Sequence, residues 1–126
     1  MRVDVISREY PPHVYGGAGV HVTELVRAMR NSIDVRVRCF DEPVAEEGTY
    51  GYTVPEDLRD ANAALGFLGA DIRIAADVDG ADLVHSHTWY ANQAGNIAAR
   101  LHGIPHIISC LLYTSPSPRD KRQISY

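Results

Sequence analysis

The chain has 126 residues, of which 45% are hydrophobic and 22% are charged. That length suits one modest domain with a single core and excludes two independent domains. No apolar run approaches the roughly 18 residues of a spanning helix, and the N-terminus lacks a targeting pattern, so we expect a cytoplasmic protein without a membrane partner. Sixteen acidic against twelve basic side chains give a net charge of −4, which argues against nucleic acid as a partner.

The first half of the chain predicts a strand, a helix and a second strand. Residues Arg2–Ser7 form a β-branched run that is typical of a buried strand. Apolar residues recur at helical spacing through residues 19–30, and valines alternate with arginines through residues 33–40. Residues 41–55 carry no period, and we expect them to form a surface excursion.

The second half predicts a further alternation of helices and strands. Gly66 and Gly69 interrupt one helical pattern, which favours two short helices over a single long one. The expected elements are helices at residues 57–65 and 68–78, a strand at 81–85, a helix at 91–102 and a last strand from His106. Alternating strands and helices predict the α/β class, with a parallel, doubly wound sheet flanked by helices.

A glycine-rich loop follows the first strand. Gly16 and Gly17 stand just ahead of the predicted helix, where bare backbone amides and the helix dipole favour an anion such as phosphate. In an open parallel sheet the ligand crevice lies beyond the carboxyl ends of the strands, where this loop belongs. A plain glycine-rich turn that needs positive φ explains the same residues equally well.

A dinucleotide-binding fingerprint is the rival interpretation of this loop, and it would make the chain part of an oxidoreductase. Asp41 would hold a ribose hydroxyl about 24 residues beyond the glycines. However, Val22 takes the place of the third glycine, and residues 8–15 separate the strand from the glycines. The fingerprint therefore stays a weak alternative.

A second loop, His85-Ser86-His87-Thr88-Trp89, follows the strand at residues 81–85. The strand period of two places His85 and His87 on the same side, so one of them can face the crevice. A histidine there can hydrogen-bond a sugar hydroxyl or a reacting oxygen, and Trp89 offers an apolar platform for a sugar ring. A histidine pair with purely structural hydrogen bonds is the alternative.

Two other chemistries find little support in the sequence. A metal site built from the histidine pair with His102 and His106 lacks a carboxylate or cysteine at a suitable spacing, so we predict no metal. A serine hydrolase is not supported, because the sequence contains no G-x-S-x-G elbow. Cys39 and Cys110 are too few for a disulfide scaffold.

The two loops, in this order and at this separation, resemble a known family. They read Ser-Arg-Glu-Tyr-Pro-Pro-His-Val-Tyr-Gly-Gly-Ala-Gly-Val-His-Val-Thr-Glu-Leu at residues 7–25 and Ala-Asp-Leu-Val-His-Ser-His-Thr-Trp-Tyr-Ala-Asn at residues 81–92. They resemble bacterial glycogen synthases and, more narrowly, the retaining glycosyltransferases of the GT-B fold that extend α-1,4-glucan or make maltose 1-phosphate from a nucleotide-glucose. The similarity covers residues 1–109 and implies a partial, acceptor-side Rossmann-like domain.

The resemblance also implies roles for individual residues. Gly16 and Gly17 would meet the distal phosphate of the sugar nucleotide through their amides, and His85 would be the catalytic-site histidine that contacts the transferred glucose. The residues expected near the acceptor or in support of the loop are Glu9, Tyr10, His87 and Trp89. The nucleotide-glucose, most simply ADP-glucose, would be a substrate, and no cofactor is implied. The acceptor would be a glucan or glucose 1-phosphate.

The end of the chain departs from this pattern. The family's second Rossmann half, which supplies the base pocket and the cations that clamp the diphosphate, is absent, so we expect no turnover by this chain alone. Residues 110–120 resemble the in-frame translation of a transposase sequencing adapter, and we expect residues 110–126 to be a non-native, disordered tail. A non-catalytic sugar-binding module with a natural end near residue 109 remains an alternative.

Overall fold

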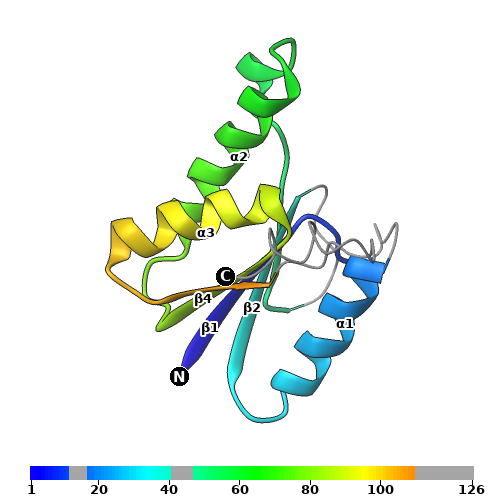
Figure 1. Ribbon diagram of the computed structural model, residues 1–126, viewed down its shortest axis with the longest axis vertical. Helices are drawn as coiled ribbons and strands as arrows, with labels where there is room; N and C mark the ends of the chain where they lie inside the picture. The colour runs from blue at the N-terminus through cyan, green and yellow to red at the C-terminus, as the bar shows by residue number, and fades with distance from the viewer. Residues whose placement is uncertain (12–16, 41–46, 110–126) are drawn as a thin grey trace, which may run out of the picture.

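The computed structural model describes residues 1–11, 17–40 and 47–109, and in this part of the chain it has the predicted α/β fold (Figure 1). The elements are β1 (Arg2–Ser7), α1 (Gly17–Met29), β2 (Asp34–Phe40), β3 (Thr49–Tyr52), a 3-10 turn (Glu56–Leu58), α2 (Ala63–Asp77), β4 (Leu83–His87), α3 (Trp89–His102) and β5 (His106–Ser109). The described strands form one parallel sheet in the order β3-β2-β1-β4-β5.

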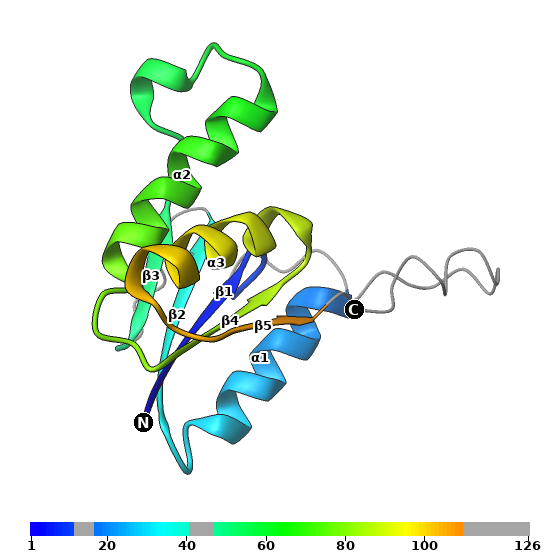
Figure 2. The same cartoon turned by 60° about the vertical axis from the view of Figure 1, so that its left-hand side comes forward.

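Helices cover both faces of this sheet (Figure 2). Helix α1 lies on one face, and α2 and α3 lie on the other. Because successive side chains of a strand point to opposite faces, Val3 and Val5 of β1 pack with Val22 of α1, whereas Ile6 packs with Ile74 of α2. The predicted parallel, doubly wound architecture is confirmed, with one hydrophobic cluster on each face of the sheet.

Strand β3 is the main element that the sequence analysis missed. Residues 41–55 were expected to form a surface excursion, yet Thr49 pairs with Val37 and Tyr52 pairs with Phe40 in parallel register. Neighbouring parallel strands usually need a crossover of about a dozen residues, and β3 follows β2 too closely to suggest one. With only four residues, one of them glycine, it also offers no periodic signal.

Helix α2 is one continuous helix, so the prediction of two short helices is wrong. Asn62 caps it by accepting a hydrogen bond from the amide three residues further on, at 3.0 Å. The glycines mark close packing and not a break. A Cβ on Gly66 would lie 3.0 Å from Val54, and one on Gly69 would lie 2.7 Å from Leu58. Packing against the segment before α2 therefore explains both glycines.

A charged network lies on the α2 side of the sheet. The buried carboxylate of Asp4 accepts hydrogen bonds from the Nε atoms of Arg2 and Arg38, each at 2.9 Å. Arg38 also donates to the Tyr52 hydroxyl at 2.8 Å, and this hydroxyl donates to Asp77 at 2.7 Å. Burial, assisted by Asp77, raises the pKa of Tyr52 to about 12. The network links β1, β2, β3 and α2.

Candidate functional site

The sheet topology puts the expected ligand crevice between the carboxyl ends of β1 and β4. The chain leaves β1 toward β2 and β3 on one side, and β4 and β5 lie on the other side of β1. Strand order reverses at this point, and ligands of open α/β sheets bind there. Parallel register sets Ser7 of β1 beside His87 of β4. The end of β1, which leads into the glycine-rich loop, therefore lies beside the histidine pair.

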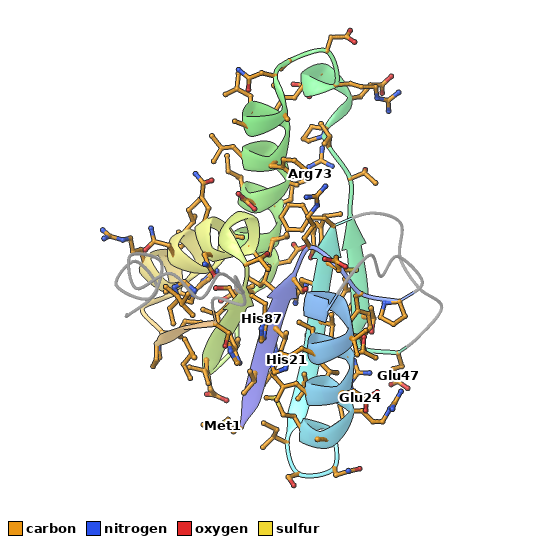
Figure 3. The ribbon with its side chains drawn as sticks, turned by 45° about the vertical axis from the view of Figure 1, so that its right-hand side comes forward. Met1, His21, Glu24, Glu47, Arg73 and His87 are labelled. Atoms are coloured by element: carbon orange, nitrogen blue, oxygen red, sulfur yellow. The ribbon has the colours of Figure 1, made fainter. Side chains whose placement is uncertain are left out.

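Three imidazoles gather on the α1 face of this crevice. The rings of His85 and His87 lie 4.2 Å apart between centroids, as expected for side chains on the same side of a strand. The ring of His21, from α1, lies 5.9 Å from that of His87. Figure 3 shows His21 and His87 between the helix and the sheet. The cluster thus joins α1 to the end of β4.

His87 is fully buried, and neither of its ring nitrogens has a hydrogen-bond partner in residues 1–11, 17–40 and 47–109. Burial, together with the neighbouring rings of His85 and His21, lowers the pKa of His87 to about 3. The imidazole is therefore neutral near pH 7, with one donor and one acceptor nitrogen. Buried polar groups are almost always paired, so this ring is a candidate for contact with a ligand.

His85 is differently placed. Its Nε2 lies 2.8 Å from the hydroxyl of Ser109, which ties the end of β4 to β5. Burial lowers the pKa of His85, and His106 and His21 add to the shift. One ring nitrogen of His85 is thus already engaged, whereas both nitrogens of His87 are unpartnered. The role that the family resemblance assigns to His85 remains a prediction, and the geometry makes His87 the stronger candidate.

The glycine-rich loop is described only from Gly17 onward. Gly17 is the first residue of α1, it is exposed, and among the described residues outside its own helix turn and chain neighbours no atom lies within 4 Å of the position that a Cβ would take. The first turn of α1 contains no acidic residue that would offset the helix dipole. An anion can therefore approach this end of α1 closely. Gly16, the second predicted phosphate ligand, lies outside the described residues.

The residues predicted for the acceptor side have varied surroundings. Tyr10 is only 4% exposed and packs into the hydrophobic cluster beneath α1. Together with Pro11 it also borders a cavity of about 420 Å³ against Thr23 of α1. The backbone carbonyl of Glu9 accepts a hydrogen bond from Ser7. Residue 89 begins α3, and its side chain lies outside the described part of the chain. The acceptor-side roles remain predictions.

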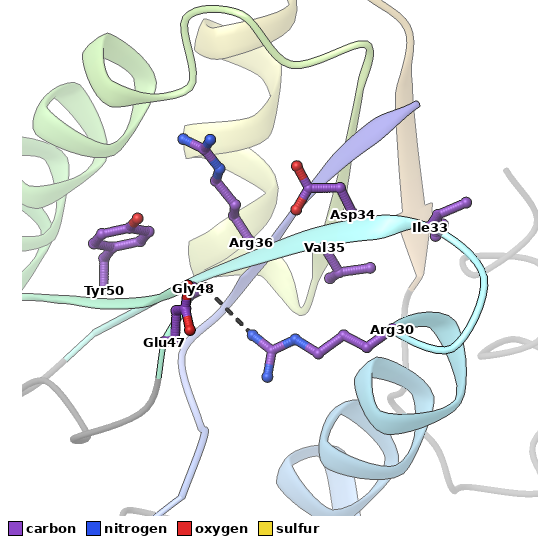
Figure 4. A pocket seen from close by; sticks show the side chains of 8 residues that line it. All are labelled: Arg30, Ile33, Asp34, Val35, Arg36, Glu47, Gly48 and Tyr50. Atoms are coloured by element: carbon purple, nitrogen blue, oxygen red, sulfur yellow. Dashed lines mark hydrogen bonds between the residues drawn. The ribbon is translucent and has the colours of Figure 1, made fainter.

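A second pocket lies away from the crevice. It has a volume of about 550 Å³ and sits beside the amino end of β2, where Arg30 donates a hydrogen bond to the carbonyl of Gly48 at 3.3 Å (Figure 4). Guanidinium groups and carboxylates both line it, from Arg30 and Arg36 and from Asp34 and Glu47. The crevice, by contrast, lies at the carboxyl ends of the strands.

A hydrogen-bonded chain supports the histidine pair from the α3 side, and the sequence analysis did not detect it. The Ser86 hydroxyl donates to Oδ1 of Asn92 at 2.7 Å, and it lies 2.7 Å from Nε2 of His106. Since the hydroxyl proton points to Asn92, Nε2 of His106 must be the donor in the second bond. Gly95 leaves room for the His106 ring, which a Cβ at that position would strike.

His21 was also missed, although its sequence position carries a signal. It lies four residues after Gly17, so the helical repeat places it on the same face of α1. Within residues 1–11, 17–40 and 47–109, no group of three or more His, Cys, Asp or Glu side chains could hold a metal ion, and this includes the three histidines of the cluster. No helix in the described part of the chain is long and apolar enough to cross a membrane.

This geometry defines a Rossmann-like α/β half with a ligand crevice at its switch point, as in GT-B glycosyltransferases. The model of glycosyltransferase family 4 matches residues 15–110, and the chain belongs to this family. It is 50% identical over 109 residues to an alpha-maltose-1-phosphate synthase of Mycolicibacterium smegmatis, a match that covers 86% of this chain and 28% of the relative. The protein of the same name from Mycobacterium tuberculosis is 46% identical over 124 residues, covering 98% of this chain and 32% of the relative. The chain thus spans about a third of the length of these relatives.

Proposed function

We propose that the chain is the N-terminal, acceptor-side part of a retaining glucosyltransferase of glycogen biosynthesis. The donor is a nucleotide-glucose, with ADP-glucose first, and the acceptor is an α-1,4-glucan or glucose 1-phosphate. One observation carries the proposal. The open amide end of α1 at Gly17 and the unpartnered ring of His87 lie at the same switch point, on the same face of the sheet. The name of the relatives, alpha-maltose-1-phosphate synthase, supports a sugar-phosphate acceptor.

In this proposal the chain's own groups bind and orient the donor. The amides of Gly16 and Gly17 receive the distal phosphate, and the histidine pair holds the glucose. A neutral His87 can donate one hydrogen bond to a sugar hydroxyl and accept another, which fixes the ring of the sugar. His85, anchored to Ser109, lines the same face and limits the movement of His87.

The proposed chemistry requires stabilisation of the leaving group. In front-face transfer the bond from the glucose C1 to the phosphate oxygen breaks as a bond to the acceptor oxygen forms. The acceptor proton passes to the departing phosphate, so the step demands neither a protein nucleophile nor a cofactor. Amides at the end of α1 stabilise the negative charge that develops on the phosphate. The relatives are about three times as long as the matched region, and we assign the base pocket and the phosphate-binding cations to the part that they have in addition.

A chimera tests this proposal. Residues 1–109 of this chain replace the matched part of the M. smegmatis relative, and glucosyl transfer is measured with ADP-glucose and UDP-glucose as donors and with glucan and glucose 1-phosphate as acceptors. We expect transfer by the chimera and a loss of about 100-fold or more in the His87→Ala variant. His102→Ala is the matched control, because His102 bonds to a carbonyl of α2, remote from the crevice.

The same experiment separates the rival functions. A folded chimera that transfers glucose from neither donor contradicts the proposal. The oxidoreductase interpretation, whose Asp41 lies outside the described residues, instead predicts that the chain binds NADH in a fluorescence titration. The sugar-binding module predicts glucan binding by the chain together with an inactive chimera.

A further inference from the structure

His21 places a third imidazole at the crevice, and neither the family resemblance nor the comparisons give it a role. Its ring is tilted by 59° against the ring of His87, at 5.9 Å between centroids. His21 is exposed, whereas His87 is fully buried at the strand end. The two rings therefore occupy different depths of one site. His87 is the deep residue, at the end of β4, and His21 is the shallow one, on α1 (Figure 3).

Helical geometry places His21 on the same face of α1 as Gly17. Residues four positions apart share a helix face, and helical side chains lean toward the N-terminus, so the side chain of His21 is expected to lean toward the turn that starts at Gly17. Within the described part of the chain, nothing crowds the Cβ position of Gly17. An anion at this helix end thus meets a backbone amide from one side and an imidazole N–H from the other.

The charged side chains nearby are engaged elsewhere. Glu24, the acidic residue of the next turn, is held by Arg27 through contacts of 2.9 and 3.0 Å. Arg8, which follows β1, lies over the ring of Phe67 on the α2 side, 5.4 Å from its centroid. In the described part of this face, His21 is accordingly the side chain placed to supply a donor to a phosphate oxygen.

We propose that His21 contacts the phosphoryl group of the donor, opposite the amide of Gly17, and so completes the phosphate subsite of this chain. The inference rests on the proposed function and extends it by one residue and one ligand group. The unpartnered, buried ring of His87 is the independent sign that a ligand occupies the crevice. Phosphate is assigned to His21, because His21 shares a helix face with Gly17 at the amide end of α1, and the sugar is assigned to His87, because its buried ring lies at the end of β4.

The test is a titration of the full 126-residue chain, labelled with ¹⁵N, followed by NMR of its amides and histidine rings. Inorganic pyrophosphate is the phosphate probe, and ADP-glucose is the donor probe. We expect pyrophosphate to shift the Gly17 amide and the His21 ring with one common affinity. The His21→Phe variant keeps a ring beside His87 but has no donor, and we expect it to bind pyrophosphate about five- to tenfold more weakly.

Two further variants sharpen this test. His21→Gln restores a side-chain N–H and should recover part of the affinity for pyrophosphate. Glu24→Gln removes an exposed charge one turn away and is the matched control. It should not weaken binding, since its side chain is engaged with Arg27. If net charge alone governed binding, Glu24→Gln would bind pyrophosphate more tightly than the parent chain. The gain in affinity would then equal the loss of affinity in His21→Phe, and the role of His21 would be contradicted.

The outcomes distinguish this inference from the function on which it rests. If His21→Phe binds pyrophosphate as tightly as the parent chain while Gly17 and His87 still respond to ADP-glucose, the role of His21 is overturned and the proposed function stands. If neither Gly17 nor the histidine pair responds to pyrophosphate or ADP-glucose, both are overturned. Amide spectra that match the parent chain establish that each variant is folded.

Discussion

The two faces of β4 differ sharply at its carboxyl end. On the α3 face, the hydroxyl of Ser86 makes two hydrogen bonds of 2.7 Å, to Asn92 and His106. On the α1 face, the next residue, His87, is equally buried and has no hydrogen-bond partner. Burial of an unpaired polar group costs about 1–3 kcal/mol. The paired face holds the strand in place, and in the proposed function the unpaired ring on the other face contacts a ligand.

The same contrast extends across the sheet. On the α2 and α3 face, Asp4, Arg38 and Tyr52 satisfy one another in a buried network. On the α1 face, the corresponding strand positions carry valines, and polar side chains gather at the carboxyl ends of the strands. The predictions that follow test whether the first face is structural and the second is functional.

The largest effect is expected for Asp4→Ala. This change leaves Arg38, whose side chain is 4% exposed, without its carboxylate partner. Breaking a buried pair on one side typically destabilises a protein by about 3–5 kcal/mol, and urea unfolding followed by circular dichroism measures it. Asp82→Ala is the control, because the exposed Asp82 binds only the amide of Arg2 and should contribute under about 1 kcal/mol. Equal effects in the two variants would contradict a structural role for the network.

Asp71 is the exception on the structural face, and Asp71→Asn should stabilise the protein. Both carboxyl oxygens of Asp71 are buried on α2 without a partner, and burial raises its pKa to about 7 from 3.8. As the pH rises, the unfolded chain loses this proton first, so stability falls between about pH 4 and pH 7. The amide has no proton to lose. We expect equal stability at pH 4 and an advantage of about 2–4 kcal/mol for Asp71→Asn at pH 8.

Thermal unfolding of the two proteins at several pH values measures this difference. Asp60→Asn, at an exposed position, is the matched control and should follow the parent chain throughout. A constant offset between Asp71→Asn and the parent chain, independent of pH, would show that Asp71 is not protonated in the folded state at neutral pH.

His87 should lower the stability of the protein as the pH falls, whereas Asp71 lowers it as the pH rises. Its pKa in the folded chain is about 3, against 6.5 when unfolded. As the pH falls below 6.5, the unfolded chain gains a proton that the folded chain does not bind, so stability is lost until the pH reaches about 3. Between pH 7 and pH 5, the parent chain should lose about 2 kcal/mol more than His87→Asn. Parallel losses in the two proteins would mean that His87 is accessible to protons.

The fold was predictable where the spacing of hydrophobic residues along the sequence matches the side of the element that packs against the core. The hydrophobic runs of β1, α1 and β2 face the core in the structure as their spacing indicates. The prediction failed where packing overrode propensity. Gly66 and Gly69 reduce helix propensity, yet they allow α2 to approach Val54 and Leu58 closely. Strand β3 gains its pairing from β2, and its own four residues do not encode it.

The candidate site shows the same division. Gly17, His85 and His87 could be predicted to lie near one another because the ends of parallel strands meet at one edge of the sheet, a rule that needs no coordinates; their roles stay predictions. The difference between the two histidines was not predictable, since His85 gains a partner only when Ser109 of β5 packs beside β4, while the ring nitrogens of His87 have none among the described residues. The bonds of Ser86 to Asn92 and His106 likewise arise only when β4, α3 and β5 pack together.

The smallest expected change in stability is that of Gly95→Ala, and its sign should depend on whether His106 is present. In the parent chain, a Cβ at position 95 strikes the ring of His106, so Gly95→Ala should displace this ring from Ser86 and destabilise the protein by about 1–2 kcal/mol. In a His106→Ala background the ring is gone, and alanine in a helix is better than glycine by up to about 1 kcal/mol. The same substitution should therefore become stabilising there. A double-mutant cycle by urea unfolding measures the reversal, and additive effects would show that Gly95 is not the residue that admits His106.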